Sequence, residues 1–289
     1  MKLVDFLTLL FVSILWGGSF LFLRLLVLEG LAPLEIVSIR MMLAALFITP
    51  FFIVKFKKYS FYDHGFAFVL VGILNTALPF TLFAFASVEL GAGSLSILQA
   101  TVPILTALLL FSIYKGEFSV FKLIGVVIGF VGLFVLVGPS GGFDPFSSIL
   151  CIIASLSYAI AGIYLAKTPE RISNSFIGMG SIIVGAIIML PFLLTSSNTL
   201  QNLTRDSWTY LAILGVINTS LAYVIFIKLI KKIGPINASF VTYLVPVSSI
   251  SLGILVLDEV FTIPMFAGSM LIFMGVFFAN SEKKPKKLL

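Results

Sequence analysis

The sequence predicts an all-α polytopic membrane protein, with ten transmembrane helices arranged as two five-helix repeats of inverted topology. Three observations support this fold class: the composition, ten apolar runs, and a fixed offset between the two halves. Hydrophobic residues make up 60% of the 289 residues and charged residues only 10%, whereas a soluble domain carries about 25% charged residues. A chain this apolar cannot cover its surface in water, so the composition excludes a soluble domain.

The helices follow from the apolar runs, because a bilayer core is crossed by about 20 consecutive apolar residues. The runs lack the alternation that a membrane β-barrel shows in segments of about ten residues. The longest connection between them, 196–207, is too short to hold a soluble domain. The ten runs are 6–27, 35–54, 65–87, 94–114, 120–138, 146–166, 176–195, 208–228, 237–257 and 262–280.

The basic residues predict the orientation, because Lys and Arg accumulate in cytoplasmic connections. If the N-terminus is cytoplasmic, every Lys and Arg lies at the cytoplasmic side except Arg205, Arg24 and Arg40. We therefore expect a multi-pass protein of the plasma or inner membrane with both termini in the cytoplasm. The net charge of +6 then reflects this topology in the lipid bilayer, and no nucleic-acid partner is expected.

An internal repeat relates the two halves of the chain. Adding 143 to a position in the third to fifth runs gives the matching residue in the eighth to tenth, as for Asn75 and Asn218. Each copy holds five spans, an odd number, so the second copy begins on the opposite side of the membrane. We expect 1–141 to form the first repeat and 142–289 the second, which ends in a short basic tail. Inverted repeats of secondary transporters place the substrate site near the midplane.

Polar residues near the middle of the predicted spans are the candidate substrate site. Asn75 and Asn218 are each the eleventh residue of their runs, where an amide either bonds a neighbouring helix or lines a hydrated cavity. Both interpretations stay open. The candidate substrate-binding residues are Trp16, Asn75, Gln99, Tyr158, Asn218, Thr242 and Tyr243.

Three prolines inside the runs are candidate helix breaks or gating points: Pro79, Pro103 and Pro246. A proline leaves the carbonyl four residues earlier without its helical donor. A freed carbonyl either marks a plain bend or accepts a hydrogen bond from a substrate ammonium group.

Two arginines lie inside the spans, and Arg40 is about 7.5 Å from the outer end of its run. Both can extend outward, so we expect an external ionic network of Arg24, Arg40, Glu35 and Glu89. Binding of a substrate carboxylate, or latching of an external gate, is the alternative role. With the arginines displaced outward, the site carries no fixed charge, and this favours a small neutral or zwitterionic metabolite over a phosphorylated one.

Other function classes receive less support from the residues. A channel would need a repeated polar stripe along a span, and no run shows one. A polytopic membrane enzyme acting on lipid or prenyl substrates is the alternative function, but it would need paired acids, bases or metal ligands. The acidic residues are scattered singly, with one His and one Cys in the chain, so we expect no catalytic residue, metal site or cofactor.

Several motifs resemble a known family. They are Trp16-Gly17-Gly18-Ser19-Phe20 in the first run, Arg40 in the second, Pro103 before Gly116-Glu117 and Gly125, and Pro246 before Asp258-Glu259 and Gly268. With these motifs, which are spread over both halves, the chain resembles the drug/metabolite transporter (DMT) superfamily, specifically its EamA family of bacterial metabolite exporters. The resemblance implies a polytopic carrier of small metabolites, often amino acids or their derivatives. The leading interpretation is therefore a secondary transporter, and by the resemblance an exporter, that alternates access to a central site. Because the sequence holds no catalytic grouping, we expect the chain not to be an enzyme.

Overall fold

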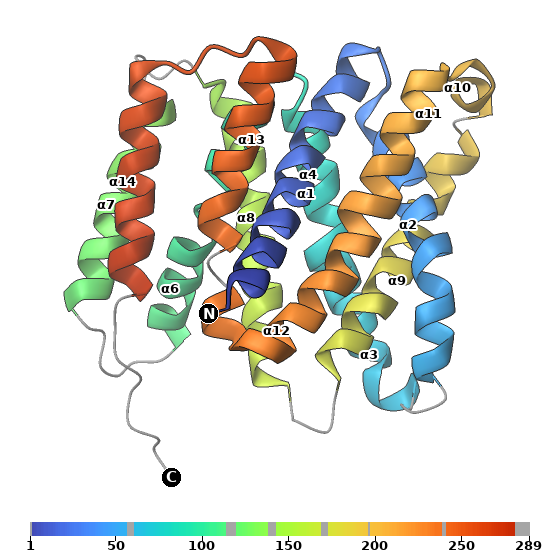
Figure 1. The fold of residues 1–289 in the computed structure, drawn as a ribbon, viewed down its shortest axis with the longest axis horizontal. Coiled ribbons are helices and arrows are strands. Elements are labelled where there is room, and N and C mark those ends of the chain that lie inside the picture. The colour runs from blue at the N-terminus through green and yellow to red at the C-terminus, as the bar shows by residue number, and fades with distance from the viewer. Residues whose placement is uncertain are drawn as a thin grey trace.

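A computed structural model describes residues 2–56, 61–113, 120–137, 143–168, 173–195, 197–238 and 241–280. Every regular element in these ranges is a helix, and two elements are π-helical (Figure 1). The first half contains α1 (Leu3–Leu28), α2 (Pro33–Phe56), α3 (Phe61–Gly72), η1 (Ile73–Ala77), α4 (Leu78–Ala86), α5 (Ala92–Gln99), α6 (Val102–Ile113) and α7 (Val120–Val137). The second half contains α8 (Pro145–Lys167), α9 (Asn174–Thr195), α10 (Ser197–Asn202), α11 (Arg205–Ala212), η2 (Ile213–Leu221), α12 (Ala222–Ala238), α13 (Val241–Leu257) and α14 (Ile263–Asn280).

Seven helical stretches among the described residues are long and apolar enough to cross a membrane. The three remaining predicted runs coincide with shorter apolar helices, at Ile124–Leu136, Leu244–Leu257 and Ile263–Gly275. Large apolar side chains such as Phe66, Phe134 and Leu255 are more than two-thirds exposed, as expected where lipid replaces water around a helix. The prediction of an all-helical membrane protein is confirmed, and the count of ten spans stays a prediction.

The two halves pack into one another rather than side by side. Helix α1 packs on α13, α2 on α9, α4 on α8, and α7 on α14, so each pair joins the first half to the second. One hydrophobic core contains residues of both halves, for example Leu26, Ile36 and Leu98 together with Leu214 and Ile272. A space enclosed by these helices is therefore built from both halves.

The α7–α14 pair lies at one end of the molecule (Figure 1), and glycines allow its close approach. A Cβ atom added to Gly275 would lie 2.6 Å from the carbonyl oxygen of Gly125, and one added to Gly132 would lie 2.8 Å from that of Gly268. Small residues that let two backbones meet are typical of helix packing in membranes. These four glycines therefore have a packing role.

The third and eighth predicted runs contain a feature that the sequence analysis did not predict. Each run becomes π-helical at its Asn-Thr pair, with Asn75 in η1 and Asn218 in η2. The backbone N–H of Leu78 donates to the carbonyl of Ile73, and that of Ala222 donates to the carbonyl of Ile217, five residues back in each case. Turns of this kind are rare in proteins, and where they do occur they often lie at functional sites.

The fourth predicted run is broken, but two residues before its proline. Helix α5 ends at Gln99, and the N–H groups of Ala100 and Thr101 turn back to Ile97 and Leu98 at 3.1 and 3.2 Å. Pro103 is then the second residue of α6, where its missing N–H costs nothing.

The other two prolines do not interrupt their helices. Pro79 lies in the first turn of α4 directly after η1, so the helical path continues with a change of turn. Pro246 lies inside α13, which is unbroken from Val241 to Leu257. The break expected at Pro246 is therefore absent.

Candidate functional site

A cavity of about 960 Å³ lies between helices of both halves. Its wall includes residues of α1, α2, α4, α5, α8, α9, α12 and α13, and of both π-helices. The cavity reaches Ser173, Asn174 and Ser175 at the start of α9. In Figure 1 this end of α9 lies on the same face of the molecule as the N-terminus. We call it the N-terminal face.

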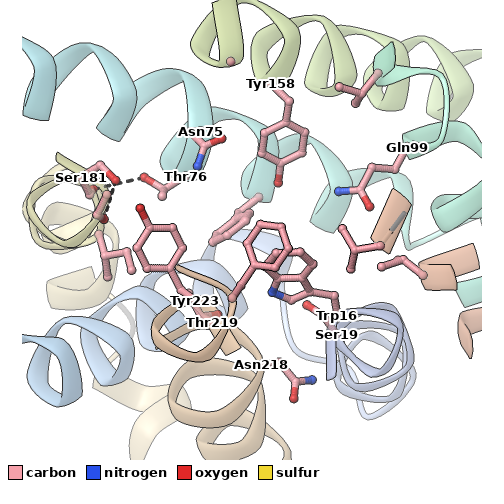
Figure 2. A pocket seen from close by; sticks show the side chains of 18 of the residues that line it. Trp16, Ser19, Asn75, Thr76, Gln99, Tyr158, Ser181, Asn218, Thr219 and Tyr223 are labelled. Atoms are coloured by element: carbon pink, nitrogen blue, oxygen red, sulfur yellow. Dashed lines mark hydrogen bonds between the residues drawn. The ribbon is translucent and has the colours of Figure 1, made fainter. Parts of the chain in front are cut away.

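The structure brings five of the seven predicted substrate-binding side chains to the wall of this cavity, as Figure 2 shows. Pro246 also lines it. The side chains of the other two, Thr242 and Tyr243, lie outside the part of the chain that the structure describes. The five are Trp16, Asn75, Gln99, Tyr158 and Asn218.

Aromatic rings from four helices form part of the wall. Trp16 of α1 meets Phe226 of α12 edge to face at 4.7 Å between ring centroids. Phe83 of α4 stacks with Tyr158 of α8 at 6.3 Å and meets Phe20 of α1 edge to face at 5.5 Å. Such faces bind apolar groups, and they also attract a cation.

The two asparagines differ in their surroundings, although they match in the repeat. Asn75 is half-buried on η1 beside the cavity. Asn218 is 2% exposed, and its amide nitrogen has no hydrogen-bond partner among the described residues. A Cβ atom added to Gly18 of α1 would lie 3.7 Å from this nitrogen, so the amide lies close to α1 without bonding it.

The threonines that follow the asparagines bond differently. Thr76 donates to the carbonyl of Gly72 and lies 3.3 Å from the carbonyl oxygen of Ser181. Thr219 donates to the carbonyl of Leu214 at 2.7 Å and accepts a hydrogen bond from Arg40. The repeat is therefore asymmetric at this point, because only the threonine of the second copy, Thr219, accepts a hydrogen bond from an arginine.

Arg40 lies inside the cavity wall, where the sequence analysis did not place it. Its side chain is 5% exposed; its Nε donates to the hydroxyl of Thr219 at 3.0 Å and its Nη2 to that of Ser19 at 3.2 Å. The guanidinium carbon lies 3.7 Å from the centre of the Phe80 ring. These partners draw the side chain into the bundle, so the outward direction expected for Arg40 is not observed.

The outer ionic network expected from the sequence differs from the contacts observed. Arg24 donates to the carbonyls of Ser87 and Val88 at 2.5 and 2.7 Å, across the ends of α1 and α4. Glu35 accepts a hydrogen bond from the N–H of Ala32 at 3.0 Å, and Glu89 is exposed. Among the described residues, no ion pair joins Arg24 or Arg40 to a carboxylate.

Glu259 joins the two halves on the face opposite the N-terminus. Its carboxylate accepts hydrogen bonds from the N–H groups of Ala92 and Gly93 at 2.6 and 3.1 Å, at the positive end of α5. A side chain at Gly91 or Gly253 would displace this carboxylate, because an added Cβ at either position would lie against one of its oxygens. With the Arg24 contacts, these bonds join α1 to the end of α4, and the end of α13 to the start of α5, at the end of the molecule remote from Ser173. We call this end the closed face.

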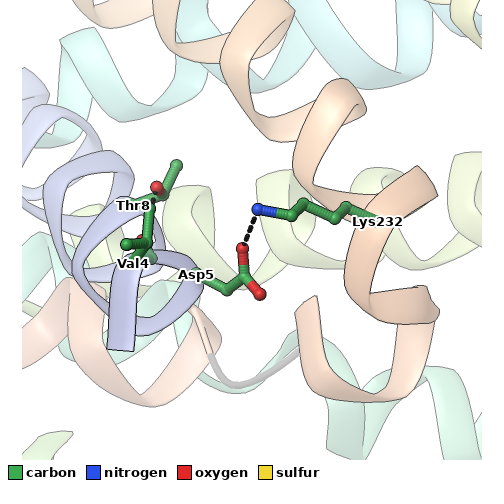
Figure 3. Close-up of polar contacts among 4 residues, drawn as sticks. All are labelled: Val4, Asp5, Thr8 and Lys232. Atoms are coloured by element: carbon green, nitrogen blue, oxygen red, sulfur yellow. Dashed lines mark hydrogen bonds and ion pairs between the residues drawn. The ribbon is translucent and has the colours of Figure 1, made fainter. Parts of the chain in front are cut away.

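On the N-terminal face, one ion pair joins α1 to α12 (Figure 3). The Lys232 ammonium lies 2.5 Å from the Asp5 carboxylate, whose side chain is 7% exposed. Nothing in the sequence analysis singled out this pair. Among the described residues, no group of three or more His, Cys, Asp or Glu side chains could hold a metal ion.

Comparison with known proteins identifies the family. The model of the EamA-like transporter family matches residues 5–138 and, a second time, residues 145–281. The chain belongs to the EamA-like transporter family. The two matches cover nearly the whole chain, and they confirm the family that the motifs resemble.

Relatives of this EamA-like chain are named as transporters. It is 24% identical to the uncharacterized transporter YoaV of Bacillus subtilis, over 94% of this chain and 96% of that protein. It is also 24% identical to the uncharacterized transporter YvbV of Bacillus subtilis, over 97% and 93%. The uncharacterized inner membrane transporter YedA of Escherichia coli is 23% identical, over 83% and 78%.

A solved crystal structure shares the fold of this EamA-like chain. The TM-score is 0.61 at 14% sequence identity, and the match covers 97% of this chain and 98% of the other.

Proposed function

We propose that the chain is a secondary transporter that carries small neutral or zwitterionic metabolites, such as amino acids or their derivatives, by alternating access. The cavity supports this most directly. It is built from both halves of the chain, reaches the N-terminal face at Ser173–Ser175, and lies beneath contacts that close the opposite face. A carrier exposes its site to one side of the membrane at a time.

The size and lining of the cavity suit a small metabolite. Sites for small molecules occupy about 300–1,000 Å³ and combine apolar walls with a few polar groups. The cavity falls within this range, and its wall combines seven aromatic side chains with polar groups that include the amides of Asn75 and Gln99.

The proposal includes ten spans in two inverted repeats, 1–141 and 142–289. Supporting it, the offset of 143 residues that pairs Asn75 with Asn218 also pairs the two π-helical segments in which they lie. With the termini in the cytoplasm, as the basic residues indicate, this conformation opens to the cytoplasm. A cavity loaded from that side suits export from the cell.

Reconstituted protein tests the proposal. Liposomes that contain the purified chain are assayed for uptake of radiolabelled alanine, leucine and phenylalanine, and we expect saturable uptake of at least one of them. Gly162 lines the cavity, and an added Cβ there would meet no atom within 4 Å. A Gly162→Trp variant should therefore fill the cavity and block uptake, whereas Gly162→Ala should not. Uptake no faster than in empty liposomes for all three solutes would overturn the proposal.

A further inference from the structure

We propose that Arg40 is the anion-binding residue of the cavity and that the transported solute carries one carboxylate group. This inference rests on the proposed function and narrows its substrate class. Of the two arginines for which carboxylate binding was an alternative role, it assigns that role to Arg40, because Arg40 lies in the cavity wall and not at the outer surface. The carboxylate would occupy the part of the cavity between α1, α2 and η2, where Ser19, Arg40 and Thr219 meet.

The first step is the charge of this site. Arg40 is 5% exposed, and its described polar partners are two neutral hydroxyls. A buried charge is costly unless an opposite charge is close to it. No carboxylate of the described residues forms an ion pair with Arg40, so an anionic solute supplies the missing charge.

The second step is the hydrogen-bonding capacity that Arg40 keeps. A guanidinium has five N–H donors, and the bonds from Nε and Nη2 to Thr219 and Ser19 use two of them. Both hydrogens on Nη1 are without a protein acceptor among the described residues. The side chain lines the cavity, and two neighbouring N–H groups of a guanidinium match the two oxygens of a carboxylate.

The third step is the fixed position of the group. The hydroxyls hold Nε and Nη2 from two helices, and the Phe80 ring lies 3.7 Å from the guanidinium carbon. A guanidinium oriented before binding loses little freedom when the solute arrives. These contacts therefore orient Arg40 for an anion.

The number of cations limits the charge of the solute. Arg24 is engaged with the carbonyls of Ser87 and Val88 at the closed end, and Lys55 donates to Ser175 where the cavity reaches the N-terminal face. Arg40 is thus one positive charge within the wall. A monocarboxylate balances it, whereas a phosphate with two negative charges would bring an excess of charge into a site of low dielectric.

Ligand-induced thermal stabilisation of the purified full-length chain tests this inference without a transport assay. The probes are alanine, leucine and phenylalanine, their carboxamides, the corresponding carboxylic acids without the amino group, and inorganic phosphate. We expect at least one carboxylate to raise the unfolding midpoint, with an apparent affinity about tenfold or more above that of its amide. Arg40→Gln should remove this difference and Arg40→Lys should reduce it. Arg24→Gln is the matched control and should preserve it.

Three outcomes would overturn the inference: no carboxylate stabilises the native chain, carboxylate and amide act alike, or phosphate stabilises it more than every carboxylate. If Arg40→Gln does not fold, the test rests on two other comparisons. They are the difference in apparent affinity between acid and amide in the native chain, and the same difference in Arg40→Lys. Binding without uptake in liposomes would reject the proposed transport and keep Arg40 as an anion site. Uptake that does not distinguish acid from amide would reject the role of Arg40 alone.

Discussion

The Nε of Arg40 on α2 donates a hydrogen bond to the hydroxyl of Thr219 on η2, 3.0 Å away. This bond joins a buried cation of the first half to the π-helical segment of the second half, at the wall of the cavity. The matching threonine of the first half, Thr76, likewise donates to a carbonyl of its own helix, that of Gly72, but accepts no hydrogen bond from an arginine. The two threonines therefore form a matched pair in which only one supports the arginine.

Replacing Thr219 with valine should weaken carboxylate binding. The change removes the acceptor of Arg40 Nε, and an unpaired buried donor costs about 1–3 kcal/mol. We expect a lower unfolding midpoint and a severalfold loss of carboxylate affinity, both measured by thermal shift. Thr76→Val is the matched control, and carboxylate affinity should be unchanged in it. Equal affinities in the two variants would contradict the supporting role of Thr219.

Replacing Glu259 with glutamine should loosen the closed face. The amide cannot keep both charge-assisted bonds to the N–H groups of Ala92 and Gly93. We expect a Leu23→Cys side chain, in the cavity wall, to react severalfold faster with an impermeant thiol reagent added on the face opposite the N-terminus. The single native thiol, Cys151, is buried and gives little background.

Asp258→Asn is the control for this experiment. Asp258 is the neighbouring carboxylate, it is exposed, and its φ of 52° suits asparagine. Labelling should stay at the native rate in this variant. Equal acceleration in both variants would point to a general charge effect and remove Glu259 as the closing contact.

Leucine at Asn75 or Asn218 should reduce uptake and spare the fold. Leucine has a similar volume, and interhelical hydrogen bonds in membranes contribute only about 0.6 kcal/mol on average. The Asn218 amide nitrogen has no partner to lose, so its variant should unfold at or above the native midpoint. A polar solute group left unpaired would lose about 1–3 kcal/mol of binding. Native uptake rates with an intact fold would exclude these asparagines from the site.

Replacing Gly275 with valine should destabilise the α7–α14 pair. An added Cβ would lie 2.6 Å from the Gly125 carbonyl oxygen, and overpacking of this kind costs about 1–3 kcal/mol. We expect a clearly lower unfolding midpoint in detergent. Gly162→Ala adds a methyl group where no atom lies within 4 Å, so its midpoint should not fall. A native midpoint for Gly275→Val would show that the two backbones are not held together there.

The helices could be predicted from the sequence because their signal is local. The apolar runs 6–27 and 35–54 lie within α1 (Leu3–Leu28) and α2 (Pro33–Phe56), and each helix end lies within three residues of the predicted one. Their polar ends and apolar length decide where a helix starts and stops in a bilayer. The repeat can also be predicted, because the same residues recur 143 positions later in the chain. This offset aligns the Asn-Thr pairs of both halves.

The direction of Arg40 could not be predicted, because it depends on three partners distant in sequence. Ser19, Phe80 and Thr219 draw the guanidinium inward, and an arginine near a span end without them extends to the interface. The π-helical turns at Asn75 and Asn218 could not be predicted either, because so short a turn produces no hydrophobic periodicity distinct from that of the α-helix around it. The helix ends at Gln99, shortly before Pro103, as expected for a proline that cannot continue a helix.

Counterflow in proteoliposomes tests the central claim most directly. Vesicles that contain the purified chain are loaded with the unlabelled carboxylate that binds best, and a trace of the same labelled solute is added outside. A carrier with one alternating site should accumulate label transiently above its equilibrium level, with saturation by the outside solute and abolition in Gly162→Trp. Equilibration without overshoot, at a rate that rises linearly with concentration, would contradict alternating access and indicate a pore.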